Sequence, residues 1–74
     1  MRNTREIESM LDFIEREGYW LTDESSYLYS FEKSDGSRMT TEDLNLIFDI
    51  AVEFAPITVE SDSSGYEAIV KILN

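Results

Sequence analysis

Carboxylates are the side chains through which this chain could do chemistry, because histidine and cysteine are both absent. Sixteen aspartates and glutamates stand against six lysines and arginines, which gives a formal net charge of −10 over 74 residues. Carboxylates can pair with arginine and lysine, coordinate a metal ion, or work in twos as acid and base. Their spacing and surroundings decide which of these roles is open to them.

Eight acidic residues are candidates for contact with a basic partner. Glu8, Asp12 and Glu15 are spaced so that a helix would place them on one face. The others belong to a predicted turn and to a second predicted helix. The complete set is Glu8, Asp12, Glu15, Asp23, Glu24, Glu42, Asp49 and Glu53. A net charge of about 2 to 8 in magnitude suffices for solubility, so the surplus acidity favours binding to a cationic surface.

The same sequence gives little support for an enzyme or a metal site. Without histidine or cysteine, the commonest acid–base groups and nucleophiles of enzymes are missing, and nothing here selects two carboxylates as a catalytic pair. The loops around Asp35-Gly36 and over residues 62–65 lack the alternating ligands and the final bidentate glutamate of a calcium-binding EF-hand. We therefore expect ordinary turns in both loops, no catalysis, no metal and no cofactor.

Direct contact with nucleic acid or with a membrane is not expected. Phosphate binding needs clustered lysines and arginines, whereas Arg2, Arg5 and Arg16 stand among glutamates. The aromatic segment 27–31 could stack on bases, but it is more often the core face of a strand. No apolar run is long enough to span a bilayer, and no apolar segment of a signal peptide follows the first arginines. The expected location is the cytoplasm.

A helix predicted over residues 4–17 must position the first acidic group. Asn3 and Glu6 form a capping-box-like pair at its start, and Gly18 can end it in a left-handed conformation. An apolar stripe at helical spacing predicts its buried face. The stripe consists of Ile7, Met10, Leu11 and Ile14.

A second helix is predicted over residues 41–55, capped by Thr40 or Thr41 and ended by Pro56. Its predicted core stripe is Leu44, Ile47, Phe48, Ala51, Phe54 and Ala55. Replacement of Phe48 by alanine would then cost about 3–5 kcal/mol. Beyond this stripe the apolar surface extends over Leu46, Ile50 and Val52, which indicates a central helix or one covered by another molecule.

Four short strands complete the predicted elements, over residues 19–22, 27–32, 57–60 and 66–73. In the second and fourth strands, period-two alternation places one apolar set on one face. These sets are Tyr27, Tyr29 and Phe31, and Tyr66, Ala68, Val70 and Ile72. The order αββαββ predicts a single small acidic α+β domain over residues 1–74, with a four-stranded antiparallel sheet and both helices packed on one face. The other face would carry Ser30, Glu32, Thr58 and Glu60.

These observations favour a small protein-binding module that acts as a stoichiometric inhibitor. It would mask a basic surface of a nucleic-acid-binding protein or nuclease, with carboxylates standing where phosphates stand. Phage inhibitors of bacterial defence, such as anti-CRISPR proteins, share this size and charge, as do antitoxins and immunity proteins. That link is an analogy of class. Trp20 would be either an apolar anchor of the interface or a core residue.

The alternative is a self-associating structural or adaptor domain. A homodimer could cover the surplus apolar arc of the second helix, and the acidity would then serve only solubility.

Overall fold

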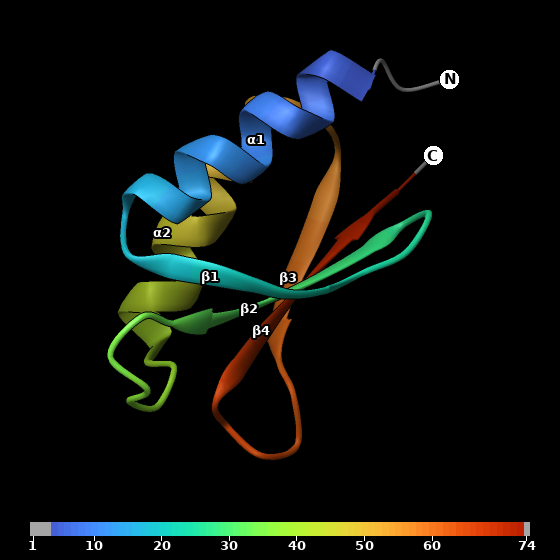
Figure 1. The fold of residues 1–74 in the computed structure, drawn as a ribbon. Helices are drawn as coiled ribbons and strands as arrows, with labels where there is room; N and C mark the ends of the chain where they lie inside the picture. Colours follow the sequence, from blue (N-terminus) through green and yellow to red (C-terminus); the bar gives the residue numbers. More distant parts are fainter. Residues whose placement is uncertain (1–3, 74) are drawn as a thin grey trace.

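The computed structural model describes residues 4–73 and contains six elements in the predicted order (Figure 1). They are α1 (Thr4–Arg16), β1 (Tyr19–Glu24), β2 (Leu28–Lys33), α2 (Thr41–Ala51), β3 (Ile57–Ser61) and β4 (Glu67–Ile72). This confirms the α+β class and the αββαββ order. The predicted cap at Asn3 lies outside the described residues. No helix within them is long and apolar enough to cross a membrane.

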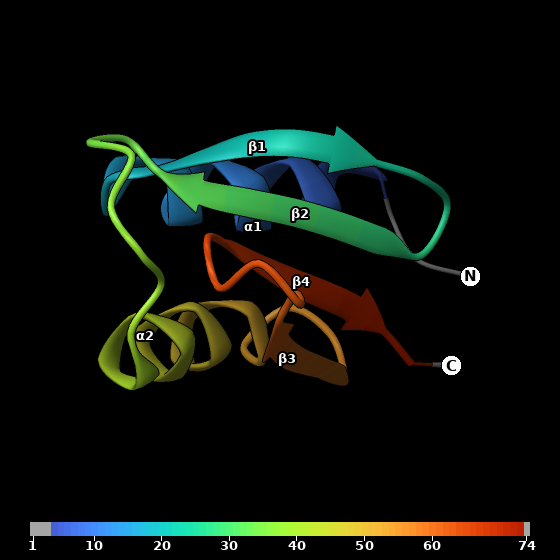
Figure 2. The same cartoon turned by 90° about the horizontal axis from the view of Figure 1, so that it is seen from below.

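The four strands form one antiparallel sheet in the order β1-β2-β4-β3 (Figure 2). The two hairpins are joined through β2 and β4, so β1 and β3 are the edges. Central strands β2 and β4 place Phe31 opposite Ala68 and Tyr29 opposite Val70. This register aligns the apolar residues of both hairpins on one face, because side chains alternate along each strand.

Both helices pack on that apolar face, as predicted. Helix α1 contacts β1 and α2, and α2 contacts β3 and β4. Met10 and Ile14 of α1 and Ile47 of α2 are fully buried against the strands. The polar residues predicted for the other face lie there. Two aromatic residues differ from expectation, since Tyr27 and Tyr66 fall just outside β2 and β4 and are 55% and 43% exposed.

Helix α2 ends four residues before the predicted end. Its start is as predicted, because Thr40 and Asp43 form a reciprocal capping box. After Ala51 the backbone tightens: the Phe54 amide donates to the Ala51 carbonyl three residues earlier. Pro56 disfavours a helical conformation in the residue before it, and the chain must turn here to enter β3.

Phe48 and Trp20 are both exposed, which contradicts the prediction for Phe48 and decides between the two interpretations of Trp20. Phe48 is 39% exposed, so the predicted loss of about 3–5 kcal/mol for Phe48→Ala is wrong. The sheet contacts a narrow strip of α2 centred on Ile47 and Ala51, and Phe48 lies about 100° around the helix from Ile47. Trp20 is 59% exposed, which excludes the core interpretation of this residue.

Candidate functional site

All eight predicted partner-binding acids are exposed on the folded chain. Three lie on α1, two on β1 and two on α2, and Glu53 lies in the turn that follows α2. The ion pair between Lys33 and Asp43 includes none of the eight. Their carboxylates are therefore open to solvent and to a partner.

The acids of α1 face the outer side of the β1 edge. The Phe13 ring lies 5.8 Å from the Phe54 ring, so the flank of α1 that carries Phe13 faces the end of α2. Successive helix residues turn by about 100°, which places Glu8, Asp12 and Glu15 on the opposite flank. Because α1 lies over β1 and α2 lies over β3, that flank points away from α2 and toward the free edge of β1.

Strand β1 extends two residues beyond its predicted end and carries Asp23 and Glu24 along the same edge. A β-bulge interrupts its register, since Leu21 pairs with Phe31 but Asp23 already pairs with Ser30. The extra residue re-aims the side chain that follows it. Asp23 is aligned with Ser30 on the uncovered face of the sheet, whereas Glu24 is aligned with Tyr29 on the helix-covered face.

A depression of about 320 Å³ lies beside this bulge and is lined by Leu21, Thr22, Asp23 and Glu24. Its two acids belong to opposite faces of the strand. Glycoside hydrolysis needs two carboxyl groups that flank one bond, and this arrangement does not converge in that way.

The structure thus brings five of the eight acids around one edge and leaves three elsewhere. Glu8, Asp12 and Glu15 approach the β1 edge from the helix layer, and Asp23 and Glu24 lie on the edge strand itself. Glu42, Asp49 and Glu53 belong to α2 and the turn after it, over the other half of the sheet. A single partner surface could therefore contact the five acids around the β1 edge more readily than all eight acids at once.

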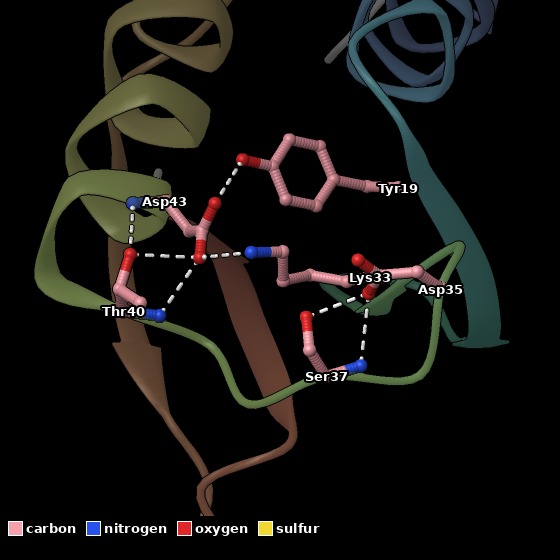
Figure 3. Close-up of polar contacts among 6 residues, drawn as sticks. All are labelled: Tyr19, Lys33, Asp35, Ser37, Thr40 and Asp43. Carbon is pink, nitrogen blue, oxygen red and sulfur yellow. Dashed lines mark hydrogen bonds and ion pairs between the residues drawn. The ribbon is translucent and has the colours of Figure 1, made fainter.

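Asp43 has a structural role that the sequence interpretation did not identify (Figure 3). Its carboxylate accepts hydrogen bonds from the Tyr19 hydroxyl at 2.7 Å and from the Thr40 backbone amide at 2.8 Å, and it pairs with Lys33 Nζ at 3.1 Å. The Thr40-x-x-Asp43 spacing is a capping signal that the sequence contains. The contacts with Tyr19 and Lys33 depend on packing between distant segments.

These contacts shift the pKa values of both Asp43 and Tyr19. Burial alone would raise the pKa of Asp43, but hydrogen bonds from Tyr19, Thr40 and Lys33 outweigh burial and hold this pKa well below its ordinary value of 3.8. Burial, followed by the hydrogen bond to Asp43, raises the pKa of Tyr19 well above its ordinary value of 10.0. The pair therefore keeps a charged aspartate and a neutral tyrosine across the neutral pH range.

We expect Asp43 to make the fold sensitive to acid. Its lowered pKa means that its contribution to stability is present above about pH 4 and is lost as the pH falls toward the folded-state pKa. Urea unfolding between about pH 6 and pH 2 should show this loss. Protonation of the other acids relieves repulsion and acts in the opposite direction, so the measured quantity is the difference between wild type and Asp43→Asn. That difference should shrink with falling pH, and a constant difference would contradict the assignment.

The two oxygen-rich loops use their aspartates within their own turns. Asp35 accepts hydrogen bonds from the amide and hydroxyl of Ser37. Asp62 accepts from the Ser64 hydroxyl and from the Gly65 amide. These bonds lower the pKa of both carboxyls. Across residues 4–73, no group of three or more acidic side chains is arranged to hold a metal ion.

Comparisons with protein-family models, with curated proteins and with solved structures find no match to this chain. Its function is therefore argued from the geometry and charge of its own surface.

Proposed function

We propose that the protein binds a basic surface of a nucleic-acid-binding protein or nuclease in a one-to-one complex and blocks access of nucleic acid to it. One observation carries this proposal: eight carboxylates are exposed and stand outside the internal ion pair. Carboxylates pair with arginine and lysine as phosphates do. The protein would act by occupancy, without catalysis or a cofactor.

The placement of the basic residues supports a strongly negative surface. Lys33 pairs with Asp43. The Arg16 guanidinium lies 5.0 Å from the Phe13 ring centre, and Arg38 lies over Tyr66 at 4.8 Å and donates to the Ser64 carbonyl. Lys33, Arg16 and Arg38 are thus each held by a contact within the fold. A rigid surface with excess negative potential speeds encounter with a cationic partner and fixes its orientation.

Size and charge favour a class of protein within this proposal. Phage inhibitors of bacterial defence such as anti-CRISPR proteins, antitoxins and immunity proteins are small acidic chains that neutralise nucleases or nuclease complexes. We propose a role of this kind in the cytoplasm. The support is an analogy of class together with the exposed acids.

The test is displacement of DNA from purified arginine-rich nucleases and DNA-binding proteins of bacterial defence and toxin systems, each bound to a labelled duplex. The protein should displace the duplex from its target at one-to-one stoichiometry without binding the duplex itself. Affinity should fall steeply as NaCl rises from about 50 to about 500 mM, because exposed charge pairs are screened. Complex formation that is insensitive to salt would contradict the proposal.

Charge reversal on α1 should weaken this complex without unfolding the protein. In the triple variant Glu8→Lys, Asp12→Lys, Glu15→Lys, three attractive contacts become repulsive. Exposed charge pairs contribute about 0.2–1 kcal/mol each, so a loss of affinity of at least about tenfold is expected. Competition binding measures the affinity, and circular dichroism checks the fold.

The matched control is the triple variant Glu6→Lys, Glu17→Lys, Glu60→Lys, which changes the net charge by the same amount at other exposed positions. It should retain most of the affinity. Equal losses in both variants would show that total charge acts rather than the α1 flank, and normal binding by the first variant would exclude that flank as the site.

Self-association is a second candidate, favoured by one observation on α2. Leu46, Phe48 and Val52 are 37%, 39% and 41% exposed on this helix and its end. A homodimer through α2 would cover them, although it would bring two strongly negative chains together. Light scattering during size exclusion separates the candidates. Added salt should strengthen such a dimer by screening repulsion, whereas it should weaken an electrostatic complex with a basic partner.

A further inference from the structure

The sheet face opposite the helices is uncovered and carries the most exposed large apolar side chain of the described residues. Strands β1 and β2 lie in front of α1 in Figure 2, with their near face free. Trp20 stands on this face and is 59% exposed. It is also the single tryptophan of the chain. Tryptophan is strongly enriched among the residues that dominate binding energy.

Two glutamates extend from Trp20 across the sheet in one row. Trp20 is paired with Glu32, and Glu32 is paired with Glu67. Neighbouring strands lie about 4.8 Å apart, so Glu32 is the direct cross-strand neighbour of both Trp20 and Glu67, whereas Trp20 and Glu67 lie about two strand spacings apart. Like charges directly opposite each other on a sheet are destabilising, and both glutamates are half-buried. The Thr22 hydroxyl donates to Glu67 Oε1 at 2.8 Å, which leaves the negative charge in place.

The basic residue of this face within the described chain lies at its far end. Lys71 is paired with Leu28 and with Thr58, in another row of the sheet. Lys33 follows Glu32 but reaches the helix-covered side, where it meets Asp43. The bulge in β1 adds a further acid, because it aligns Asp23 with Ser30 on the uncovered face. Within residues 4–73, Trp20 thus lies at one end of an acidic row of this face, and the lysine of the face lies in a different row.

We propose that this face, centred on Trp20, Glu32 and Glu67, is the surface that receives an arginine side chain of the basic protein partner. A guanidinium stacks on an indole and pairs with carboxylates through its planar edge. It would also relieve the repulsion between Glu32 and Glu67. This inference rests on the proposed binding of a basic protein and adds the place and the chemistry of contact.

Charge complementarity decides between this occupant and others. A second copy of the chain would bring the same carboxylates against this row and add repulsion. Nucleic acid would bring phosphates against Glu32 and Glu67, with the same result. A cationic protein segment is the occupant that both the ring and the acids attract.

The probe is a synthetic ten-residue peptide of alternating arginine and glycine, with a citrulline version as its neutral control. Calorimetry gives the affinity of binding to the whole protein. Fluorescence reports this site directly, since Trp20 is the sole tryptophan. The arginine peptide should change Trp20 emission with the same dissociation constant that calorimetry gives, and the citrulline peptide should do neither.

Two variants test the residues, and a third provides a matched control. Trp20→Ala and the double variant Glu32→Gln, Glu67→Gln should each weaken peptide binding by about tenfold, which corresponds to about 1.4 kcal/mol. The control Glu6→Gln, Glu17→Gln removes the same charge at exposed positions outside the eight acids and outside the sheet face, and should change affinity less than about twofold. Circular dichroism verifies that all variants fold.

The outcomes separate this inference from the proposed function. Peptide binding without a change in Trp20 emission, or equal losses in the test and control variants, would overturn the sheet-face site and leave binding through the α1 acids intact. If the peptide does not bind but the protein still displaces DNA, the Trp20→Ala variant is measured in the displacement assay. Undiminished displacement by this variant would overturn the inference, and a loss of displacement would support it. Failure of both assays would reject the proposed function itself.

Discussion

Replacement of Phe31 by alanine is expected to unfold most of the protein at room temperature. Phe31 is fully buried on the central strand β2, where it pairs with Leu21 and with Ala68. Truncation of a buried phenylalanine costs about 3–5 kcal/mol, through lost burial and the cavity that remains. The core of a domain this small supplies about that much stability in total. Urea unfolding followed by circular dichroism measures the change.

Phe48→Ala is the matched control for this prediction, because the same side chain is truncated on the surface of α2. With 39% of the residue exposed, a cost of about 1 kcal/mol is expected. If the two variants were equally destabilised, α2 would pack on the sheet through a different face from the one described.

Asp43→Ala is expected to cost about 2–3 kcal/mol, although Asp43 is one of sixteen acids in the chain. The substitution removes the reciprocal cap of α2 and the acceptor of the Tyr19 hydroxyl. It also leaves Lys33 without its ion-pair partner. A charged group with several hydrogen bonds and little exposure contributes more than a surface ion pair. Thermal and urea unfolding should both report the loss.

Asp49→Ala offers the comparison at an exposed position of the same helix. Its effect should stay within about 0.5 kcal/mol. A combined Asp43→Ala, Tyr19→Phe variant adds a second check, because two residues in one hydrogen bond should show non-additive losses. Additive losses would mean that the contact at 2.7 Å contributes nothing to stability.

The proposed partner surface has two parts that meet at the β1 edge. The α1 flank and β1 itself contribute exposed acids, and the uncovered sheet face contributes Trp20 with its two glutamates. The acids of α2 lie apart from both. The charge-reversal and peptide experiments therefore test adjacent regions, and a partner that contacts both would lose affinity in both.

Local patterns in the sequence determined the elements and much of the core. The stripe that contains Met10 and Ile14 predicts α1 and its buried face, and both residues are fully buried. The Thr40 cap of α2 follows from a local signal, a threonine at the start of the helix followed three residues later by Asp43. Gly18 ends the α1 region with a positive φ of 102°. The exposure of the eight acids follows from the cost of burying a charge.

Tertiary structure alone decided which of these side chains come together. The pairing of β2 with β4 fixes the sheet order and sets Glu32 opposite Glu67, although thirty-five positions separate them in the chain. The bulge in β1 turns Asp23 to the uncovered face, and helix packing leaves Phe48 and Trp20 exposed. Periodicity tells which face of an element is apolar. It does not tell which strand lies beside it or what covers its other side, because those depend on contacts between segments that are distant in sequence.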